Sequence, residues 1–257
     1  MDTESSPESR AGSRKDGAFP TTHWSMVLKA GGKPDVESSA ALETLCGLYW
    51  YPLYAFVRRQ GRSHHDAQDC TQKFFERFLA VEGIARARPE RGRFRSYLLA
   101  SLRNFMTEEW ERASAAKRGG GEIHLSLDFT MAGEKFAREP VDKNVTPEQA
   151  FDCNWAMGVV ERALLELRAE HAAGARGEVF DALAPLLWSD GRGEPLVNLG
   201  QRLGMAEGTV RVALHRMRKR LGECLRAQIA ATVETDDEVA DELHYLIKAI
   251  GAKGPAR

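Results

Sequence analysis

The residues best suited to chemistry lie in one stretch near the C-terminal end, GMAEGTVRVALHRMRKRL at 204–221. Five lysines and arginines fall between Arg211 and Arg220, with no acidic residue among them. Apolar residues recur at helical spacing and predict a buried stripe of Val210, Ala213, Leu214, Met217, Leu221 and Leu225. The opposite face then carries Thr209, Arg211, Val212, His215, Arg216 and Lys219. Because arginine pairs bidentately with guanine and valine contacts the thymine methyl, this face favours the major groove of DNA. A solvated basic face is the alternative.

The residues before this face predict the element that positions it. A short helix is expected over Leu196–Leu203 and a longer helix from about Glu207. Gly204 suits the left-handed conformation that often follows a helix end. Gly200 has no side chain, so the two helices can approach closely there. This order of elements is typical of a helix-turn-helix.

Composition excludes several other classes of protein. The four cysteines are far apart and form no C-x-x-C pair, which argues against a zinc site or a disulfide framework. No uncharged apolar run approaches the roughly 18 residues of a membrane helix, and the polar N-terminus is no secretory signal. We therefore expect no membrane association and a cytoplasmic protein. No nucleophile elbow, phosphate-binding glycine loop or pair of catalytic acids is present, and His64 and His65 are adjacent rather than i, i+4. The sequence thus predicts no enzyme, no cofactor and no metal site.

Charge is distributed unevenly along the 257 residues, although the net charge is only −1. Residues 41–118 carry 14 basic and 9 acidic side chains, 119–152 carry 3 and 7, and 230–257 carry 3 and 6. Helical periodicity predicts an all-α fold of two small helical domains, at 38–118 and 146–230, joined by an acidic linker at 119–145. An N-terminal tail with a short helix precedes them (1–37), and an acidic, amphipathic tail follows (231–257).

Three helices are expected in the first domain, over about 39–60, from a Ser63 cap onward, and from about Phe94. Thr146-Pro-Glu-Gln149 predicts the start of a helix with a capping box, and another helix is expected over 179–188. Within the linker, HLSLDF alternates as a strand does, but it is too short to support a sheet.

Three segments together resemble a known family. AEGTVRVALHRMRKRL is similar to the SEGTVKSRLHRARKRL-like strings in the DNA-reading domain of bacterial RNA polymerase sigma factors. SHHDAQDCTQKFFERFL resembles the DAEDLVQEVFLRLW-type helix of their N-terminal domain, and FRSYLLASLRNFMTEEWERASAAKR resembles the segment that follows it. The chain therefore resembles a sigma factor of the extracytoplasmic-function (ECF) subfamily, which keeps only a region 2-like bundle and a region 4-like helix-turn-helix. Ala206 departs from the family, which usually has a serine cap there.

The resemblance implies core RNA polymerase and promoter DNA as partners, and it allows an anti-sigma factor. In the family, the helix matching 65–79 docks on the β′ clamp helices, and the second domain meets the β flap and the −35 element. The matching polar positions here are Asp66, Asp69, Gln72, Glu76 and Arg77. Helix-dipole stabilisation is the alternative for Asp66 and Asp69, and Phe74 and Phe78 are expected to face inward.

The family reads and melts the −10 element with residues matching 86–118. The resemblance implies that role for Arg91, Arg93, Phe94, Arg103, Asn104 and Trp110. Five arginines between Arg86 and Arg95 can neutralise phosphates, and aromatic or guanidinium planes can hold extruded bases. Core packing is the alternative for Phe94 and Trp110.

The C-terminal tail is additional to the family pattern. Its apolar stripe consists of Val239, Leu243, Leu246, Ile247 and Ile250. Our hypothesis is that this tail packs on the second domain or an adjoining partner and moderates DNA binding. A stand-alone helix-turn-helix regulator that does not bind core polymerase is the alternative function, but it leaves the first domain unexplained.

Overall fold

The computed structural model describes residues 27, 30–31, 36–80, 83–84, 86–87, 93–115, 132–138, 145–174, 176–189, 194–230, 233 and 235–251. Every regular element within them is helical, which confirms the all-α prediction. The strand-like segment at 124–129 and most of the segment at 1–37 lie outside the described residues. Among the described helices, none combines the length and apolar character that crossing a membrane requires.

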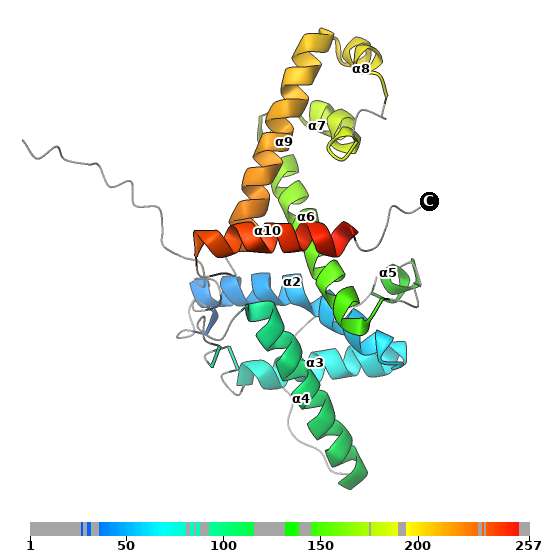
Figure 1. Ribbon diagram of the computed structural model, residues 1–257, viewed down its shortest axis with the longest axis vertical. Helices are drawn as coiled ribbons and strands as arrows, with labels where there is room; N and C mark the ends of the chain where they lie inside the picture. The colour runs from blue at the N-terminus through cyan, green and yellow to red at the C-terminus, as the bar shows by residue number, and fades with distance from the viewer. Residues whose placement is uncertain are drawn as a thin grey trace, which may run out of the picture.

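Three helices pack together at one end of the molecule (Figure 1): α2 (Val36–Arg59), α3 (His64–Ala80) and α4 (Phe94–Ala115). Their positions confirm the three helices predicted for this part of the chain. Ser63 caps α3 as predicted, because its Oγ accepts a hydrogen bond from the Asp66 N–H at 3.1 Å. Aromatic side chains dominate the core between these helices, and Phe74 and Phe78 face inward as expected.

The long helix α6 (Pro147–Ala173) belongs to both hydrophobic cores of the described chain. It begins at the predicted capping box, in which Thr146 and Gln149 exchange side chain-to-backbone hydrogen bonds of 3.2 and 2.9 Å. Phe151 and Trp155 near its start pack into the core of α2 to α4, whereas Leu167 packs into the second core. One helix therefore links the regions predicted as domains at 38–118 and 146–230, and those limits stay predictions.

The second core is built by α7 (Gly177–Leu183), a 3₁₀ turn (Ala184–Leu186), α8 (Leu196–Leu203) and α9 (Glu207–Ala230) together with the end of α6. The helix expected over 179–188 is α-helical only to Leu183, because Pro185 lacks the N–H that would continue the ladder. Both helices of the helix-turn-helix have the predicted starts. Gly204 ends α8 in the left-handed conformation, with φ of 64°.

Two further helices complete the described structure. The helix α10 (Asp236–Gly251) lies across α6 and α9 (Figure 1) and begins at a capping box formed by Thr235 and Glu238. Of the predicted apolar stripe, Val239 and Leu246 are buried, but Ile247 is 66% exposed, so its assignment to the buried face was wrong. The short helix α5 (Ala132–Arg138) lies within the predicted linker and was not expected from the sequence.

Candidate nucleic-acid and polymerase interfaces

The predicted DNA-reading face of α9 is exposed along its length. The exposed side chains on it are Thr209, Arg211, Val212, His215, Arg216 and Lys219. Val212 is 48% exposed although it is apolar, which leaves its methyl groups free to contact another molecule. The opposite face is buried in the second core through Val210, Leu214 and Met217. The helix-turn-helix therefore holds this mixed polar, basic and apolar face toward solvent.

The structure divides the arginines of α9 into two groups. Arg218 donates hydrogen bonds to the carbonyl oxygens of Leu186 and Ser189, at 2.7 and 2.9 Å, and so secures the turn after α7. Arg220 pairs with Glu170 of α6 at 2.5 Å. By contrast, the ion pair that Arg211 forms with the described residues is an exposed i, i+4 pair within α9, and such pairs are worth about 0.3–0.5 kcal/mol. Arg211 can thus exchange its partner for DNA at little cost, whereas Arg218 and Arg220 have structural roles.

Three of the predicted −10 residues lie exposed on α4. Arg103 and Asn104 are exposed, and Trp110 is 67% exposed near the end of the helix. Phe94 is only 2% exposed, and its ring packs edge-on against Tyr49 with 5.5 Å between centroids. For Phe94 the alternative of core packing is therefore correct, because this first-turn ring faces α2 and is buried against it. Arg91 lies outside the described residues.

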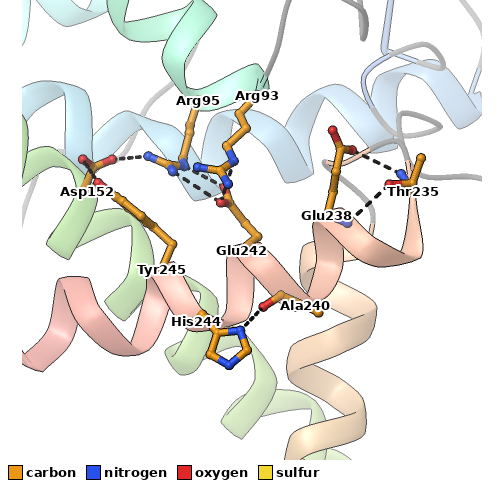
Figure 2. Close-up of polar contacts among 9 residues, drawn as sticks. All are labelled: Arg93, Arg95, Asp152, Thr235, Glu238, Ala240, Glu242, His244 and Tyr245. Carbon is orange, nitrogen blue, oxygen red and sulfur yellow. Dashed lines mark hydrogen bonds and ion pairs between the residues drawn. The ribbon is translucent and has the colours of Figure 1, made fainter.

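Two arginines at the start of α4 are bound by a buried carboxylate of α10 (Figure 2). Glu242 is 2% exposed, accepts a hydrogen bond from Arg95 Nε at 2.7 Å and forms an ion pair with Arg93 Nε at 3.0 Å. Arg95 also pairs with Asp152 of α6 at 2.5 Å, and the Tyr245 hydroxyl donates to that same carboxylate at 2.5 Å. Since Arg95 is only 5% exposed, its expected role as a phosphate contact is wrong for this conformation.

The pKa values of Arg95 and Tyr245 in this network are set by burial and by their contacts with the neighbouring carboxylates. Burial acts to lower the pKa of Arg95, but its hydrogen bonds and charge interactions with Glu242 and Asp152 outweigh burial and raise that pKa. Burial also raises the pKa of Tyr245, and its hydrogen bond to Asp152 raises it further, so the phenol remains a donor. The guanidinium carbon of Arg95 lies 4.1 Å from the centre of the Tyr245 ring, a cation–π contact.

A third cation of α4 is also paired with an acid from outside its own three-helix group. Arg103 forms an ion pair with Glu148 in the first turn of α6. Partial burial acts to raise the pKa of Glu148, but hydrogen bonds from its own backbone N–H and from Arg103 outweigh this and lower the pKa. Both side chains are substantially exposed, at 49% and 40%, so we expect the pair to contribute no more than about 1 kcal/mol.

The predicted polymerase-docking residues lie along α3. Asp66 and Asp69 are exposed, whereas Gln72, Glu76 and Arg77 are half-buried. A hydrogen bond from Ser63 lowers the pKa of Asp66 more than any other interaction does, so Asp66 has a local role at the helix start. Arg77 pairs with Glu108 of α4 at 2.5 Å and thereby ties the two helices together.

A cleft of about 250 Å³ lies between the start of α3 and the end of α4. Its apolar lining includes Phe105, Met106 and Trp110, and its charged lining includes Asp66 and Asp69. The cleft therefore brings a residue from the predicted −10 set next to two from the predicted polymerase set.

Comparison with protein families identifies this part of the chain. Residues 51–116 match Sigma-70 region 2. The matched segment begins inside α2 and contains α3, α4 and the cleft between them. No curated protein and no solved structure matches the chain. The match supports a sigma factor of the sigma-70 family.

A Sigma-70 region 2 domain implies a role in binding core RNA polymerase and in melting promoter DNA. The predicted residues for both roles, Asp66 to Arg77 on α3 and Arg91 to Trp110 around α4, lie inside the matched segment. Which of them make the contacts stays a prediction. The helix-turn-helix at 196–221 lies outside the match, so its reading of the −35 element also stays a prediction.

Sequence reasoning missed the acids that meet α4. Glu148, Asp152 and Glu242 were counted only as part of acidic segments, and Tyr245 was not considered. The one signal that pointed to them was the alternation of basic and acidic blocks along the chain. That pattern predicts attraction between blocks but not which carboxylate meets which guanidinium.

Proposed function

We propose that this chain is a sigma factor of the ECF subfamily that binds core RNA polymerase and directs initiation at promoters with −35 and −10 elements. Residues 38–118 act as the region 2-like domain, and 146–230 as the region 4-like domain. The observation that carries the proposal is an exposed basic face on a helix-turn-helix, located after a Sigma-70 region 2 segment in the same chain.

In this proposal α9 enters the major groove of the −35 element. Arg211 and Arg216 read bases, and Val212 contacts a thymine methyl. His215, Thr209 and Lys219 complete the contact to bases and phosphates. The same domain meets the β flap, as the resemblance implies, and an anti-sigma factor stays a predicted partner.

Polymerase binding occurs through α3, whose exposed Asp66 and Asp69 face the β′ clamp helices together with Gln72, Glu76 and Arg77. The −10 element is opened along α4, where Arg103, Asn104 and Trp110 are exposed. Arg93, which directly precedes α4, contacts phosphates of the same DNA strand.

The first experiment separates a sigma factor from a stand-alone regulator. The full chain is immobilised and incubated with purified core RNA polymerase, and the bound enzyme is tested for promoter opening by permanganate footprinting. Charge reversal of Asp69 to lysine should weaken the association, whereas reversal of the exposed Glu43 on α2, outside the matched segment, should leave it unchanged. A wild-type chain that does not retain core polymerase would favour the regulator.

The second experiment tests base reading by α9. Arg211→Ala combined with Arg216→Ala should weaken binding of the polymerase complex to its promoter by about 1–3 kcal/mol per base-reading arginine. Arg226→Ala, which removes an arginine further along the same helix, is the matched control. If the double variant loses the same affinity for every DNA sequence, the two arginines contact phosphates only.

A further inference from the structure

The cations at the start of α4 do not face solvent freely. Glu242 of α10 accepts hydrogen bonds from Arg95 and forms an ion pair with Arg93, and Asp152 of α6 accepts another hydrogen bond from Arg95 (Figure 2). A carboxylate offers guanidinium groups the same kind of anionic oxygen acceptors that a DNA phosphate offers. The protein itself thus supplies the carboxylate oxygens that DNA phosphates would have to replace.

Because of the position of α10, the contact between Glu242 and the two arginines depends on how α6, α9 and α10 are arranged relative to α4. Its buried Val239 and Leu246 pack in the core that α2 to α4 share with α6, and the helix contacts both α6 and α9. Its carboxylate reaches α4 across 147 positions of sequence. A movement of α6 and α9 away from α4 would therefore carry Glu242 and Asp152 off the arginines.

The network is stable only while it is complete. Arg95 and Glu242 are 5% and 2% exposed, and removing one partner from a buried ion pair leaves an uncompensated charge. When the helices separate, each charged group must regain water or find a new partner. DNA phosphates are such partners for the arginines but not for Glu242, so DNA binding favours the separated arrangement.

We propose that α10 keeps the chain in a closed state, in which it covers the promoter-melting face at the start of α4. In this state Glu242 binds Arg93 and Arg95 in place of DNA phosphates, until α10 moves away from α4. This inference rests on the proposed function, because it assumes that the start of α4 meets promoter DNA. Closure is a property of the free chain. It ends when DNA binding, by the free chain or by the chain on polymerase, separates α6, α9 and α10 from α4.

The test uses the full chain and a fluorescein-labelled single-stranded oligonucleotide of mixed sequence, with binding followed by anisotropy. Glu242→Gln keeps the shape of the side chain but removes the charge that holds both arginines. We expect it to bind the oligonucleotide about ten-fold or more tightly than wild type, as expected when a closed state loses a charge-assisted contact. Asp241→Asn removes the same charge from an exposed neighbouring position of α10 and is the matched control, with no change beyond about two-fold expected. Equal affinities for wild type and Glu242→Gln, or an equal gain in the control, would overturn the proposal.

Hydrogen exchange of the wild-type chain gives a second readout that does not depend on any variant folding. Backbone amides of α10 should exchange faster when the oligonucleotide is bound, because Val239 and Leu246 lose their packing in the core that α2 to α4 share with α6. Unchanged protection of α10 in the DNA complex would contradict closure. Retention of core polymerase by the same wild-type protein separates the two ideas. A chain that retains polymerase but shows no effect at Glu242 disproves closure alone, whereas a chain that retains none disproves the proposed function.

Discussion

Replacing Gly200 by alanine tests how closely α8 approaches the turn that leads into α9. A Cβ atom at this position would lie 2.6 Å from the carbonyl oxygen of Met205 and 3.6 Å from the amide nitrogen of Glu207. The turn cannot easily move away, because the Met205 N–H donates to the Gly200 carbonyl at 2.8 Å. The added methyl group therefore meets backbone atoms rather than a flexible side chain.

The expected magnitude follows from two opposing contributions. Alanine is favoured over glycine in a helix interior by about 1 kcal/mol. Crowding a packed site costs about 1–3 kcal/mol, and loss of the turn hydrogen bond costs about 1 kcal/mol more. We expect Gly200→Ala to lower the free energy of unfolding by about 2 kcal/mol, the balance of these contributions. Gly208→Ala is the matched control, because a Cβ there meets no atom of the described residues within 4 Å, and it should raise the free energy of unfolding by up to about 1 kcal/mol.

Denaturant unfolding followed by far-UV circular dichroism measures both variants against wild type. The two substitutions have the same chemistry and lie eight positions apart in the same helix-turn-helix. A difference between them therefore reports the space around Gly200. If Gly200→Ala proved as stable as Gly208→Ala, the close approach of α8 to the turn would be refuted.

Two further predictions concern helix ends, and a third concerns one ion pair. Thr146→Ala removes the capping box of α6 and should lower the free energy of unfolding by about 1 kcal/mol, whereas Ala206→Ser supplies a cap to α9 and should raise it by a similar amount, both measured by denaturant titration. Hydrogen bonds from Arg220 lower the pKa of Glu170 below its ordinary 4.5, so the pair stabilises the fold above that pH, and this stability is lost as the pH falls through the lowered pKa. Glu170→Gln should therefore be less stable than wild type at neutral pH and equal to it in acid, and parallel pH profiles of the denaturation midpoint in the two proteins would contradict this.

Local signals in the sequence predicted most of the helix ends correctly. The caps at Ser63 and Thr146 and the left-handed Gly204 depend on residues within four positions of each other, so their effect can be worked out without the fold. The faces of α9 followed from helical periodicity for the same reason. Phe94 and Trp110 differ because periodicity alone does not say which end of α4 is covered. The start of α4 packs on α2, whereas Trp110 near its end stays 67% exposed.

Which arginines are buried in ion pairs and which are exposed could not be predicted, because this depends on contacts between distant segments. Arg95 meets Glu242 across 147 positions and Asp152 across 57, and Arg220 meets Glu170 across 50. Residue type and local spacing are similar for Arg93, Arg95 and the arginines of α9. What separates a buried structural arginine from an exposed one is the element that covers it, which only the tertiary arrangement determines.

The alternation of charge along the chain has a structural explanation in these contacts. The acidic blocks at 119–152 and 230–257 supply Glu148, Asp152 and Glu242, and all three meet arginines of the basic block at 41–118. The net charge of −1 follows from 36 basic and 37 acidic residues, and these contacts show that some of the acids lie beside arginines of the basic block. If promoter DNA binds along α4, it competes with these internal carboxylates for the same arginines. Affinity for DNA then depends on how far α6 and α10 have moved from α4, as well as on the number of basic side chains that α4 carries.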